Sequence, residues 1–364
     1  MTTLRVIVDD ILRPGGGPLA RYAEDLTRAL IQTTPRGSEV AGVVASSPEG
    51  DYARIRELLT GLRQLHKSSL ARRELAAAWQ HGFTALPGTG MVHAPSLFAP
   101  LRRHDRSLAP GDQTVVTIHD AIAWTHPDLL PARAASSTKA MGRRAEKHAD
   151  AIVVPTHAVA ADLAEHLDLG DRVRVIGAAP ATTLNVPADA ASRRAGRGLD
   201  QPYVVAQVEG DAANGYADLA AVTLSGIPIV LLAAPGDAAA VDSDDRLTVI
   251  DDASAADRAA ILAGASVFVQ PNIAAGPPAA LLDALALGLP IVATDLPGIE
   301  EIAADAAILV ERGDDYAAML TDAIRGLLDD SAAAERLGVA AEDRAKAFTW
   351  RDAAEKIWQL HADL

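Results

Sequence analysis

The chain has 364 residues, which is long enough for two domains of roughly 150–200 residues each rather than for one core. Apolar residues make up 49% and charged residues 22%, as in folded globular proteins, and the absence of cysteine excludes disulfides, thiolate metal sites and cysteine nucleophiles. The net charge of −15 is uneven: residues 1–180 carry 21 basic and 19 acidic side chains, and residues 181–364 carry 12 and 29, so nucleic acid is not expected as a partner.

The start of the chain is predicted to be a strand rather than a targeting segment. Residues 1–8 lack the basic start and long apolar stretch of a signal peptide. No apolar run approaches the roughly 20 residues that span a bilayer. We therefore expect a cytoplasmic protein.

In the first half, short β-branched runs alternate with longer amphipathic stretches, which is typical of a parallel sheet with helices on both faces. Strands are predicted at Arg5–Val8, Val40–Ala45, Met91–His93, Thr114–Ile118, Ala151–Val154 and Arg174–Ile176. Helices are predicted at Leu19–Thr33, Tyr52–Leu65, Arg133–Ala149 and Ala158–His166, the last with Thr156 as its N-cap.

Residues Ala188–Asp200 have little periodicity and are expected to link two domains. Beyond them, strands are predicted at Tyr203–Val208, Ile227–Ala233, Leu247–Ile250, Val267–Gln270, Pro290–Ala293 and Ile308–Val310. Helices are predicted at Ala255–Ala263, Ala279–Leu287, Ile299–Ala303, Asp315–Leu328 and Ala332–Leu364, the last with a break near Phe348–Trp350. The pattern predicts two Rossmann-like, doubly wound α/β domains, residues 1–187 and 198–345, with the last helix, 350–364, packing back on the first.

Five segments, in a fixed order along the chain, carry a resemblance to a known family. They are Arg13–Gly17 leading into Arg21-Tyr22, the strand Thr114–Ile118 ending in His119-Asp120, Ala149–Thr156, Leu282–Asp295 and Phe348–Trp350. In this order they resemble glycosyltransferase family 4, a family of retaining, metal-independent enzymes that use nucleotide-sugar donors. The resemblance implies the GT-B fold, in which two Rossmann-like domains face each other across a cleft.

The candidate residues of the first domain are a donor-binding glycine loop on the acceptor side and two catalytic residues, His119 and Asp120. Gly15, Gly16 and Gly17 stand between a strand and a helix, where backbone can approach a ligand and the helix N-terminus offers N–H groups to an anion; a tight turn without a ligand is the alternative. His119 follows a buried strand at the edge where such sheets bind ligands, although a histidine bonded to its own loop is also consistent. The resemblance implies that His119 orients a hydroxyl or supports developing charge at the reacting sugar. Asp120 is expected to hold His119 or to cap the next turn.

The expected donor domain departs from the family's pattern. The family usually places an Arg and a Lys after its first strand, where they pair with the diphosphate, and two Glu residues eight positions apart, the first on the sugar and the second on the ribose. Here Glu209 follows the strand, and no Lys or Arg occurs between Arg197 and Arg246. Asp283 matches the second Glu, shortened by one methylene, whereas the first Glu falls on or near Ala275.

The turn before Asp283 is altered as well. Gly276 remains as a donor-binding candidate, but Pro277 and Pro278 follow it, and each removes a backbone N–H that would otherwise face phosphate. Loss of both cations and of one carboxylate would remove on the order of 5–9 kcal/mol of charge-assisted hydrogen bonding to the donor. A replacement cation could come from Arg21 or Arg13, on the acceptor side or in the cleft, or from Arg246 or Arg312.

Two functions stay open. The first is an enzyme that transfers a hexose from a nucleotide-diphosphate sugar, as substrate rather than cofactor, to a glycan or lipid-linked acceptor with retention and without a metal. The second is an inactive pseudo-glycosyltransferase that serves as a binding or scaffold subunit of an active relative, in a homo- or hetero-oligomer. A dehydrogenase is disfavoured, because the glycine loop lacks the GxGxxG fingerprint.

A basic segment between Leu62 and Leu75 adds one alternative. Four cations, Arg63, Lys67, Arg72 and Arg73, alternate there with leucines. Such a segment could contact the inner face of a membrane, as in family members that glycosylate lipid-linked acceptors, or form a solvated helix face.

Overall fold

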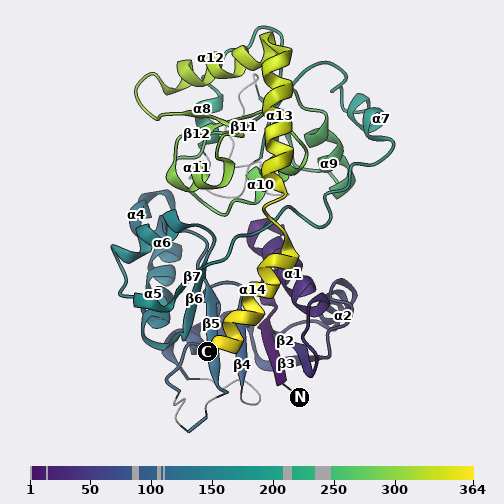
Figure 1. Cartoon of the computed structure of the whole chain (residues 1–364). Coiled ribbons are helices and arrows are strands. Elements are labelled where there is room, and N and C mark those ends of the chain that lie inside the picture. Colours follow the sequence, from purple (N-terminus) through teal and green to yellow (C-terminus); the bar gives the residue numbers. More distant parts are fainter. Residues whose placement is uncertain are drawn as a thin grey trace. The chain divides into compact units, whose positions relative to one another are not determined.

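The computed structural model describes residues 2–13, 15–83, 90–104, 108–109, 111–207, 215–233 and 247–364. The chain forms two compact units, one comprising residues 1–178 together with 349–364, and the other comprising residues 179–348. In both, helices cover the faces of a parallel sheet (Figure 1). The two-unit α/β architecture predicted from the alternating pattern is therefore confirmed.

The first unit contains a seven-stranded sheet in which every pair of neighbours is parallel. The strands are β1 (Thr2–Ile7), β2 (Ser38–Ser46), β3 (Gln64–Ala71), β4 (Met91–Ala94), β5 (Gln113–Thr117), β6 (Ala151–Val154) and β7 (Val173–Val175). Their order is β3-β2-β1-β4-β5-β6-β7, so the winding reverses between β1 and β4. This is the doubly wound order of a Rossmann-like domain.

Helices cover both faces of this sheet. They are α1 (Gly17–Gln32), α2 (Glu49–Leu58), α3 (Arg72–His81), α4 (Ile122–Thr125), α5 (Ala132–His148), α6 (His157–Ala164) and α14 (Trp350–Asp363), with short 3-10 turns η1 (Asp9–Leu12), η2 (Pro127–Leu129) and η3 (Gly170–Arg172). Strands β5 and β6 are buried along their whole length, which explains their continuous β-branched runs. The predicted cap of α6 is confirmed, because Val159 N donates to Thr156 Oγ1 at 3.2 Å.

The segment between Tyr52 and Ala71 corrects one prediction. Instead of one helix over Tyr52–Leu65, α2 ends at Leu58 and the chain turns through Gly61, whose φ is 96°. Gln64–Ala71 then forms β3, an edge strand paired with β2, so the basic segment is in part a strand rather than a helix face. Within it, Lys67 Nζ donates to Glu49 Oε2 at 3.0 Å. Polar side chains are usual on an edge strand, and they hid its periodicity.

The second unit contains six parallel strands in the order β10-β9-β8-β11-β12-β13. They are β8 (Val204–Gln207), β9 (Ile229–Leu232), β10 (Leu247–Ile250), β11 (Val267–Gln270), β12 (Ile291–Thr294) and β13 (Ile308–Val310). All six lie where strands were predicted. The winding reverses between β8 and β11, so this unit repeats the topology of the first.

The second unit has helices where they were predicted from Ala255 onward, and two short helices, α7 and α8, that were not predicted. They are α7 (Ala190–Ala195), α8 (Tyr216–Leu219), α9 (Ala255–Ala263), α10 (Ala279–Ala286), α11 (Pro297–Ala303), α12 (Tyr316–Asp329) and α13 (Ser331–Ala345). The predicted break in the last helical stretch is confirmed, because α13 ends at Ala345 and α14 begins at Trp350. Asp352 N donates to Thr349 Oγ1 at 3.1 Å, so Thr349 caps the new helix.

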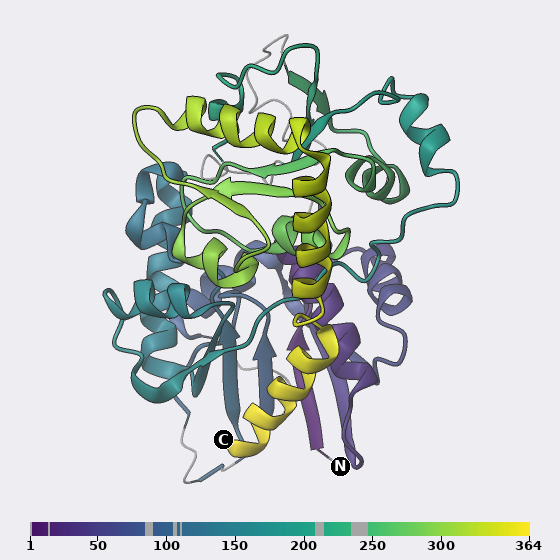
Figure 2. The same ribbon diagram turned by 45° about the horizontal axis from the view of Figure 1, so that its top comes forward.

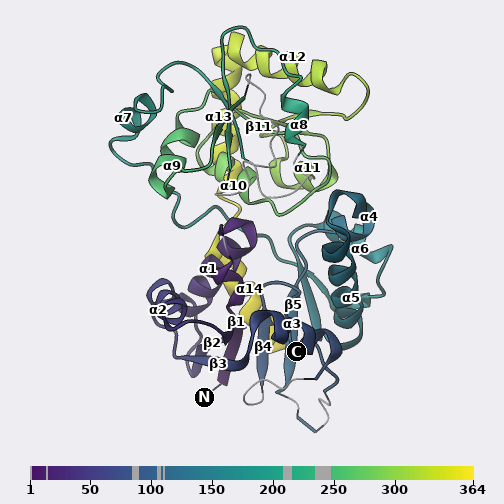
Figure 3. The same cartoon turned by 180° about the vertical axis from the view of Figure 1, so that it is seen from behind.

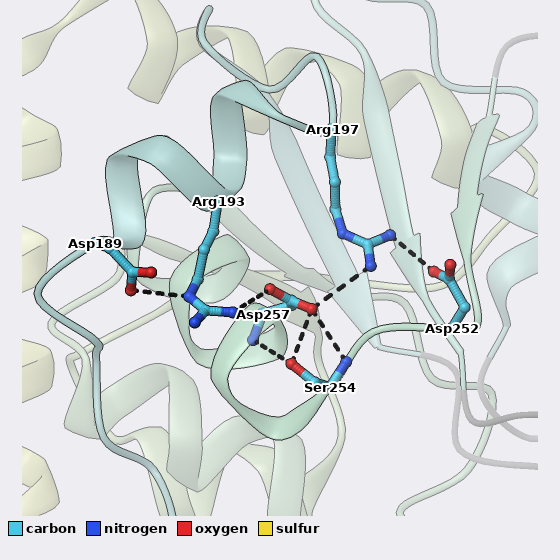
Figure 4. Close-up of polar contacts among 6 residues, drawn as sticks. All are labelled: Asp189, Arg193, Arg197, Asp252, Ser254 and Asp257. Atoms are coloured by element: carbon cyan, nitrogen blue, oxygen red, sulfur yellow. Dashed lines mark hydrogen bonds and ion pairs between the residues drawn. The ribbon is translucent and has the colours of Figure 1, made fainter.

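The expected linker, Ala188–Asp200, contains α7 and is anchored rather than free. Arg193 donates through Nε to Asp189 Oδ1 at 2.8 Å and through Nη1 to Asp257 Oδ1 at 2.9 Å (Figure 4). Arg197 Nη1 donates to Asp252 Oδ1 at 2.7 Å. These contacts tie α7 to the start of α9, because Asp257 lies in the first turn of α9.

The C-terminal helix completes the core of the first unit. α14 lies beside α1 (Figures 2 and 3). Trp358 Nε1 donates to Leu30 O at 3.2 Å, and the Trp350 ring lies edge-on to the Tyr22 ring at 5.5 Å between centroids. The last residues of the chain thus pack on helix α1, which follows the glycine loop.

Candidate functional site

The strand order indicates where ligands bind in each unit. In open α/β sheets they bind beyond the carboxyl ends of the strands, at the point where the winding reverses. This point lies beyond β1 and β4 in the first unit and beyond β8 and β11 in the second. Residues that follow these strands are therefore the candidates for a site.

A buried carboxylate joins the two strands at the reversal point of the first unit. Asp10 follows β1, and its Oδ2 accepts a hydrogen bond from Ser96 Oγ, which follows β4, at 2.6 Å. Its Oδ1 accepts from Arg72 Nη2 at 2.8 Å and from Arg13 Nη1 at 3.4 Å. One buried carboxylate thus holds two guanidinium groups and one hydroxyl.

Asp9 lies beside Asp10 and is equally buried. Its Oδ1 accepts a hydrogen bond from Ala45 N, near the end of β2, at 2.9 Å, and its Oδ2 has no partner among the described residues. Burial raises the pKa of Asp9 to about 6, with the Ala45 N–H and the charge of Arg72 acting in the opposite direction. Asp9 therefore exchanges its proton not far below neutral pH.

His119 follows β5 at the same edge, as predicted, and is 7% exposed. Its Nε2 lies 2.7 Å from Pro95 O, and because a carbonyl oxygen can only accept, Nε2 is the donor. The lone pair of the neutral ring is therefore on Nδ1. Burial lowers the pKa of His119, and the nearby charges of Asp10 and Arg13 act on it in opposite directions. The Tyr22 ring packs edge-on against it at 4.5 Å between centroids. A neutral imidazole held in one orientation can accept a hydrogen bond from a substrate hydroxyl.

The other first-unit candidates flank His119 and Asp10. Asp120 Oδ1 accepts from Ile122 N at 3.0 Å, so this carboxylate caps the following turn. Gly15, Gly16 and Gly17 have φ values of 75°, 73° and 83°, which favour glycine, and a Cβ on Gly16 or Gly17 would meet no atom within 4 Å. Arg21 lies in the second turn of α1, directly after this loop.

Two of the donor-side candidates, Asp283 and Gly276, lie on α10 or just before it. Asp283, on α10, is 2% exposed, and its Oδ1 accepts a hydrogen bond from Ala181 N at 2.9 Å. This carboxylate therefore holds the chain that enters the second unit, and a contact with ribose stays a prediction. Gly276 lies just before the start of α10 at Ala279, whereas Glu209 falls outside the described residues.

Two arginines lie at the carboxyl edge of the second sheet. Arg312, which follows β13, donates through Nη2 to Asp218 Oδ2 at 2.7 Å and through Nη1 to Pro271 O at 3.1 Å, just beyond β11. Arg258, from α9, donates through Nη1 to Ala233 O, just beyond β9, at 2.8 Å. Arg312, one of the replacement cations named from the sequence, thus lies at this edge, paired with Asp218, and Arg258 lies there as well.

Two glutamines end the strands at this reversal point. Gln207 closes β8 and Gln270 closes β11. Gln207 Nε2 and Gln270 Oε1 are both buried without a partner among the residues that the structure describes. Arg258 Nη2 also donates to Gln207 Oε1 at 3.4 Å. An unpaired amide donor and an unpaired amide acceptor therefore lie where a ligand of an open α/β sheet would bind.

Sequence reasoning missed the acidic pair, Ser96 and Arg258. A usable signal was present for Asp9 and Asp10, since they follow β1 as His119 follows β5, but two carboxylates after a strand are also a common turn. No signal was present for Arg258, because only the packing of α9 on the sheet brings its guanidinium to the edge. Within the described ranges, no helix is long and apolar enough to cross a bilayer, and no three His, Asp or Glu side chains gather as a metal site.

Two family models match the chain, one in each unit. Residues 15–178 match Glycosyltransferase Family 4, and residues 236–330 match Glycosyl transferases group 1. Among curated proteins, D-inositol 3-phosphate glycosyltransferase of Corynebacterium diphtheriae is 37% identical over 84 residues, which are 22% of this chain and 19% of that protein. Alpha-maltose-1-phosphate synthase of Mycobacterium tuberculosis is 34% identical over 108 residues, 28% of each chain. The matches thus span well under a third of these relatives.

Solved structures match over the whole chain. Sucrose-phosphate synthase from Thermosynechococcus elongatus has a TM-score of 0.69 and 19% identity, with 100% of this chain and 99% of that chain covered. The Anabaena protein HepE, in complex with UDP-glucose, has a TM-score of 0.70 and 14% identity, with both chains fully covered. At these identities the likeness establishes the fold, which is GT-B.

Proposed function

Because this chain belongs to the group 1 and family 4 glycosyltransferases, we propose that it transfers a hexose from a nucleotide-diphosphate sugar to an acceptor hydroxyl with retention of configuration. The observation that carries the proposal is His119, which follows β5 at the carboxyl edge of the first sheet. It is buried and neutral, and its Nε2 is fixed on Pro95 O, which leaves Nδ1 as the acceptor for a sugar hydroxyl. The ring is held between this carbonyl and the edge of Tyr22.

The donor is proposed to bind in the second unit, at the edge formed by β8 and β11. Gln207 and Gln270 offer the nucleotide sugar an amide donor and an amide acceptor that no described residue pairs. Arg312 and Arg258 supply positive charge for the diphosphate. Transfer then depends on positioning and on stabilisation of the leaving diphosphate, and no step needs a metal or another cofactor.

The acceptor is proposed to be a hydroxyl of a glycan or of a lipid-linked compound. Phosphorylated sugars and polyols are also acceptors worth testing. The relatives are named as an inositol 3-phosphate glycosyltransferase and as synthases of maltose 1-phosphate and of sucrose phosphate. Retention is tested by the anomeric configuration of the product in proton NMR. An inverted product would contradict that part of the proposal.

Nucleotide titration tests the donor site. We expect UDP, GDP or ADP, or one of their glucose esters, to stabilise the protein by about 2.7 kcal/mol at a hundredfold excess over Kd. Replacing one charged donor, as in Arg312→Gln, should weaken binding about 10- to 100-fold. The matched control is Arg336→Gln at an exposed position of α13, which should change affinity less than twofold. Equal losses in the two variants would argue against a diphosphate at Arg312.

Turnover tests the acceptor side independently. His119→Ala should lower the rate of sugar transfer about 100-fold or more, because the hydroxyl loses its hydrogen-bond partner. Nucleotide affinity should stay within twofold, since His119 belongs to the first unit. A variant that keeps full activity would remove His119 from the mechanism.

A scaffold role without turnover is the second candidate, and the environment of Asp283 favours it. The carboxylate expected on the ribose is buried and already accepts a hydrogen bond from Ala181 N. In that case the chain would serve as a binding subunit of a related glycosyltransferase. No thermal response to any nucleotide, combined with co-purification with an active relative, would support this role and contradict the enzymatic one.

A further inference from the structure

Two guanidinium groups converge on one buried carboxylate at the reversal point of the first unit. Arg72 begins α3 and Arg13 follows η1, so the two come from distant parts of the chain. Both reach Asp10 Oδ1, at 2.8 and 3.4 Å. The Asp10 side chain is 2% exposed, whereas those of Arg72 and Arg13 are 40% and 43% exposed. The carboxylate is therefore inside, and the cations lie between it and the surface.

The Arg72 guanidinium has more N–H donors than the described residues around it offer as hydrogen-bond acceptors. A guanidinium carries five N–H donors in a planar fork. Arg72 uses Nη2 on Asp10, and its plane lies over the Phe98 ring, 4.6 Å from the centroid. Its Nη1 is buried and has no partner among the described residues. Buried donors without a partner are uncommon, because their desolvation is uncompensated, so this atom indicates an acceptor that the described residues do not provide.

The surrounding backbone also favours an anion. Gly15–Gly17 leads into the 16-residue helix α1, whose N-cap, Gly16, offers no side-chain cap to the first N–H groups. Pro18, in the first turn of α1, has no N–H, but the remaining free N–H groups at a helix N-terminus attract negative charge. Asp10 is shared by two arginines, so these three side chains keep one net positive charge while the neighbouring Asp9 is protonated, and Asp9 cancels that charge when it is ionised. Ser96 Oγ occupies the other oxygen of Asp10, which leaves the arginines as the outward-facing donors.

His119 connects this cluster to the proposed reaction centre. His119 Nε2 donates to Pro95 O at 2.7 Å, and the next residue, Ser96, donates through Oγ to Asp10 Oδ2 at 2.6 Å. A molecule that contacts the arginines on Asp10 would therefore lie near the histidine. This arrangement suits an acceptor with an anionic group at one end and a reactive hydroxyl at the other.

We propose that the corner formed by Arg72, Arg13 and the Gly15–Gly17 loop binds a phosphate monoester carried by the acceptor. A phosphate offers several charged oxygens to two guanidinium forks, and arginine matches this geometry better than lysine does. Asp10 is a positioning residue that aims both arginines. The identification of the bound molecule as the acceptor rests on the proposed transfer function; the phosphate site itself does not. The phosphate can belong to a soluble sugar phosphate or to a lipid-linked acceptor.

Binding to the full chain, without nucleotide, tests the site. The probes are glucose 6-phosphate, glucose, glucuronate and inorganic phosphate, and isothermal titration calorimetry measures their binding. Glucose 6-phosphate should bind at least tenfold more tightly than glucose or glucuronate, and inorganic phosphate should compete with it. Vesicles of phosphatidylcholine with and without phosphatidic acid test the lipid source. Phosphate-dependent binding in either arm supports the site and assigns the source, and its absence in both overturns the proposal.

The matched variants are Arg72→Met and Arg73→Met. Methionine keeps an unbranched side chain against Phe98 and removes the charge. Arg73 is the exposed next residue of α3 and serves as the control for a loss of net charge. Arg72→Met should weaken binding of the phosphate probe about 10- to 100-fold, and Arg73→Met less than twofold. Equal weakening in both, at unchanged thermal unfolding, would show a nonspecific charge effect and overturn the site. If Arg72→Met does not fold, phosphate competition in the wild type decides.

Turnover separates this proposal from the function on which it rests. Phosphate binding that depends on Arg72, with no transfer from any nucleotide sugar, would leave the site standing and remove the enzymatic function. Transfer to unphosphorylated acceptors that is as fast in Arg72→Met as in the wild type would keep the function and overturn the phosphate site.

Discussion

Two buried histidines should make the first unit sensitive to acid. His361 of α14 and His93 of β4 have ring centroids 5.7 Å apart. His361 Nδ1 donates to Gln113 Oε1 at 3.0 Å, so its Nε2 is the proton acceptor, and no described residue contacts that atom by a hydrogen bond. Burial lowers the pKa of His361 to about 4, and burial together with the neighbouring His361 lowers the pKa of His93 well below its ordinary value.

The sign and size of the effect follow from these values. Between pH 6.5 and 4 the unfolded chain binds a proton at His361 and the folded chain does not, so stability is full above pH 6.5 and falls as the pH drops through this window. Integrating between the two pKa values, His361 alone should remove about 2 kcal/mol of folding free energy between pH 7 and pH 5. His93 adds to the loss.

Asp9 acts in the opposite direction. Its pKa is raised in the folded state, so the folded chain takes up a proton near pH 6 while the unfolded chain does not, and acid stabilises the protein at this group. The change in wild-type stability is therefore smaller than the histidine contribution. The difference between the wild type and His361→Gln isolates that contribution, because Asp9 is present in both.

Urea unfolding at pH 7 and pH 5, followed by tryptophan fluorescence, measures this difference. All four tryptophans, Trp79, Trp124, Trp350 and Trp358, belong to the first unit, so the signal reports on that unit alone. The wild type should lose about 2 kcal/mol more than His361→Gln between the two pH values. His81→Gln, at an exposed position of α3, should behave as the wild type does. An equal pH dependence in wild type and His361→Gln would refute the reasoning.

Two further predictions concern single contacts. Gly215→Ala should destabilise the second unit by about 2 kcal/mol or more, because φ is 61° and the new Cβ would collide with Pro271 O. Circular dichroism during urea unfolding measures the loss of stability. The control is Gly326→Ala in α12, where a Cβ meets no atom within 4 Å, and it should be neutral or stabilising. A Gly215→Ala variant as stable as the wild type would contradict the close approach to Pro271. Thr156→Ala should cost the first unit about 1 kcal/mol by removing the cap of α6, and a loss below about 0.3 kcal/mol in the fluorescence assay would mean that the cap contributes little.

Much of the fold was predictable because it depends on periodicity. Strands buried on both faces need continuous apolar runs, and Ala151–Val154 and Ile291–Thr294 read as strands for that reason. The end of α13 and the start of α14 were also predictable, since Thr349 is a good cap before Trp350. β3 was not, because an edge strand has one open side and its sequence needs no apolar run.

The residues of the candidate site also fall into two groups, those that the sequence could predict and those that only the structure reveals. His119 and the glycine loop were found because they directly follow a strand or precede a helix, a relation that is local in sequence. The sequence by itself determined the two parallel sheets, the resemblance to one family and the absence of cations after β8. Only the tertiary structure decided where the charges meet: Arg72 joins Asp10 across 62 positions, and Arg312 joins Asp218 across 94. Contacts between such distant residues depend on how helices pack on a sheet, and periodicity specifies which face of an element is buried but not which side chains meet at its end.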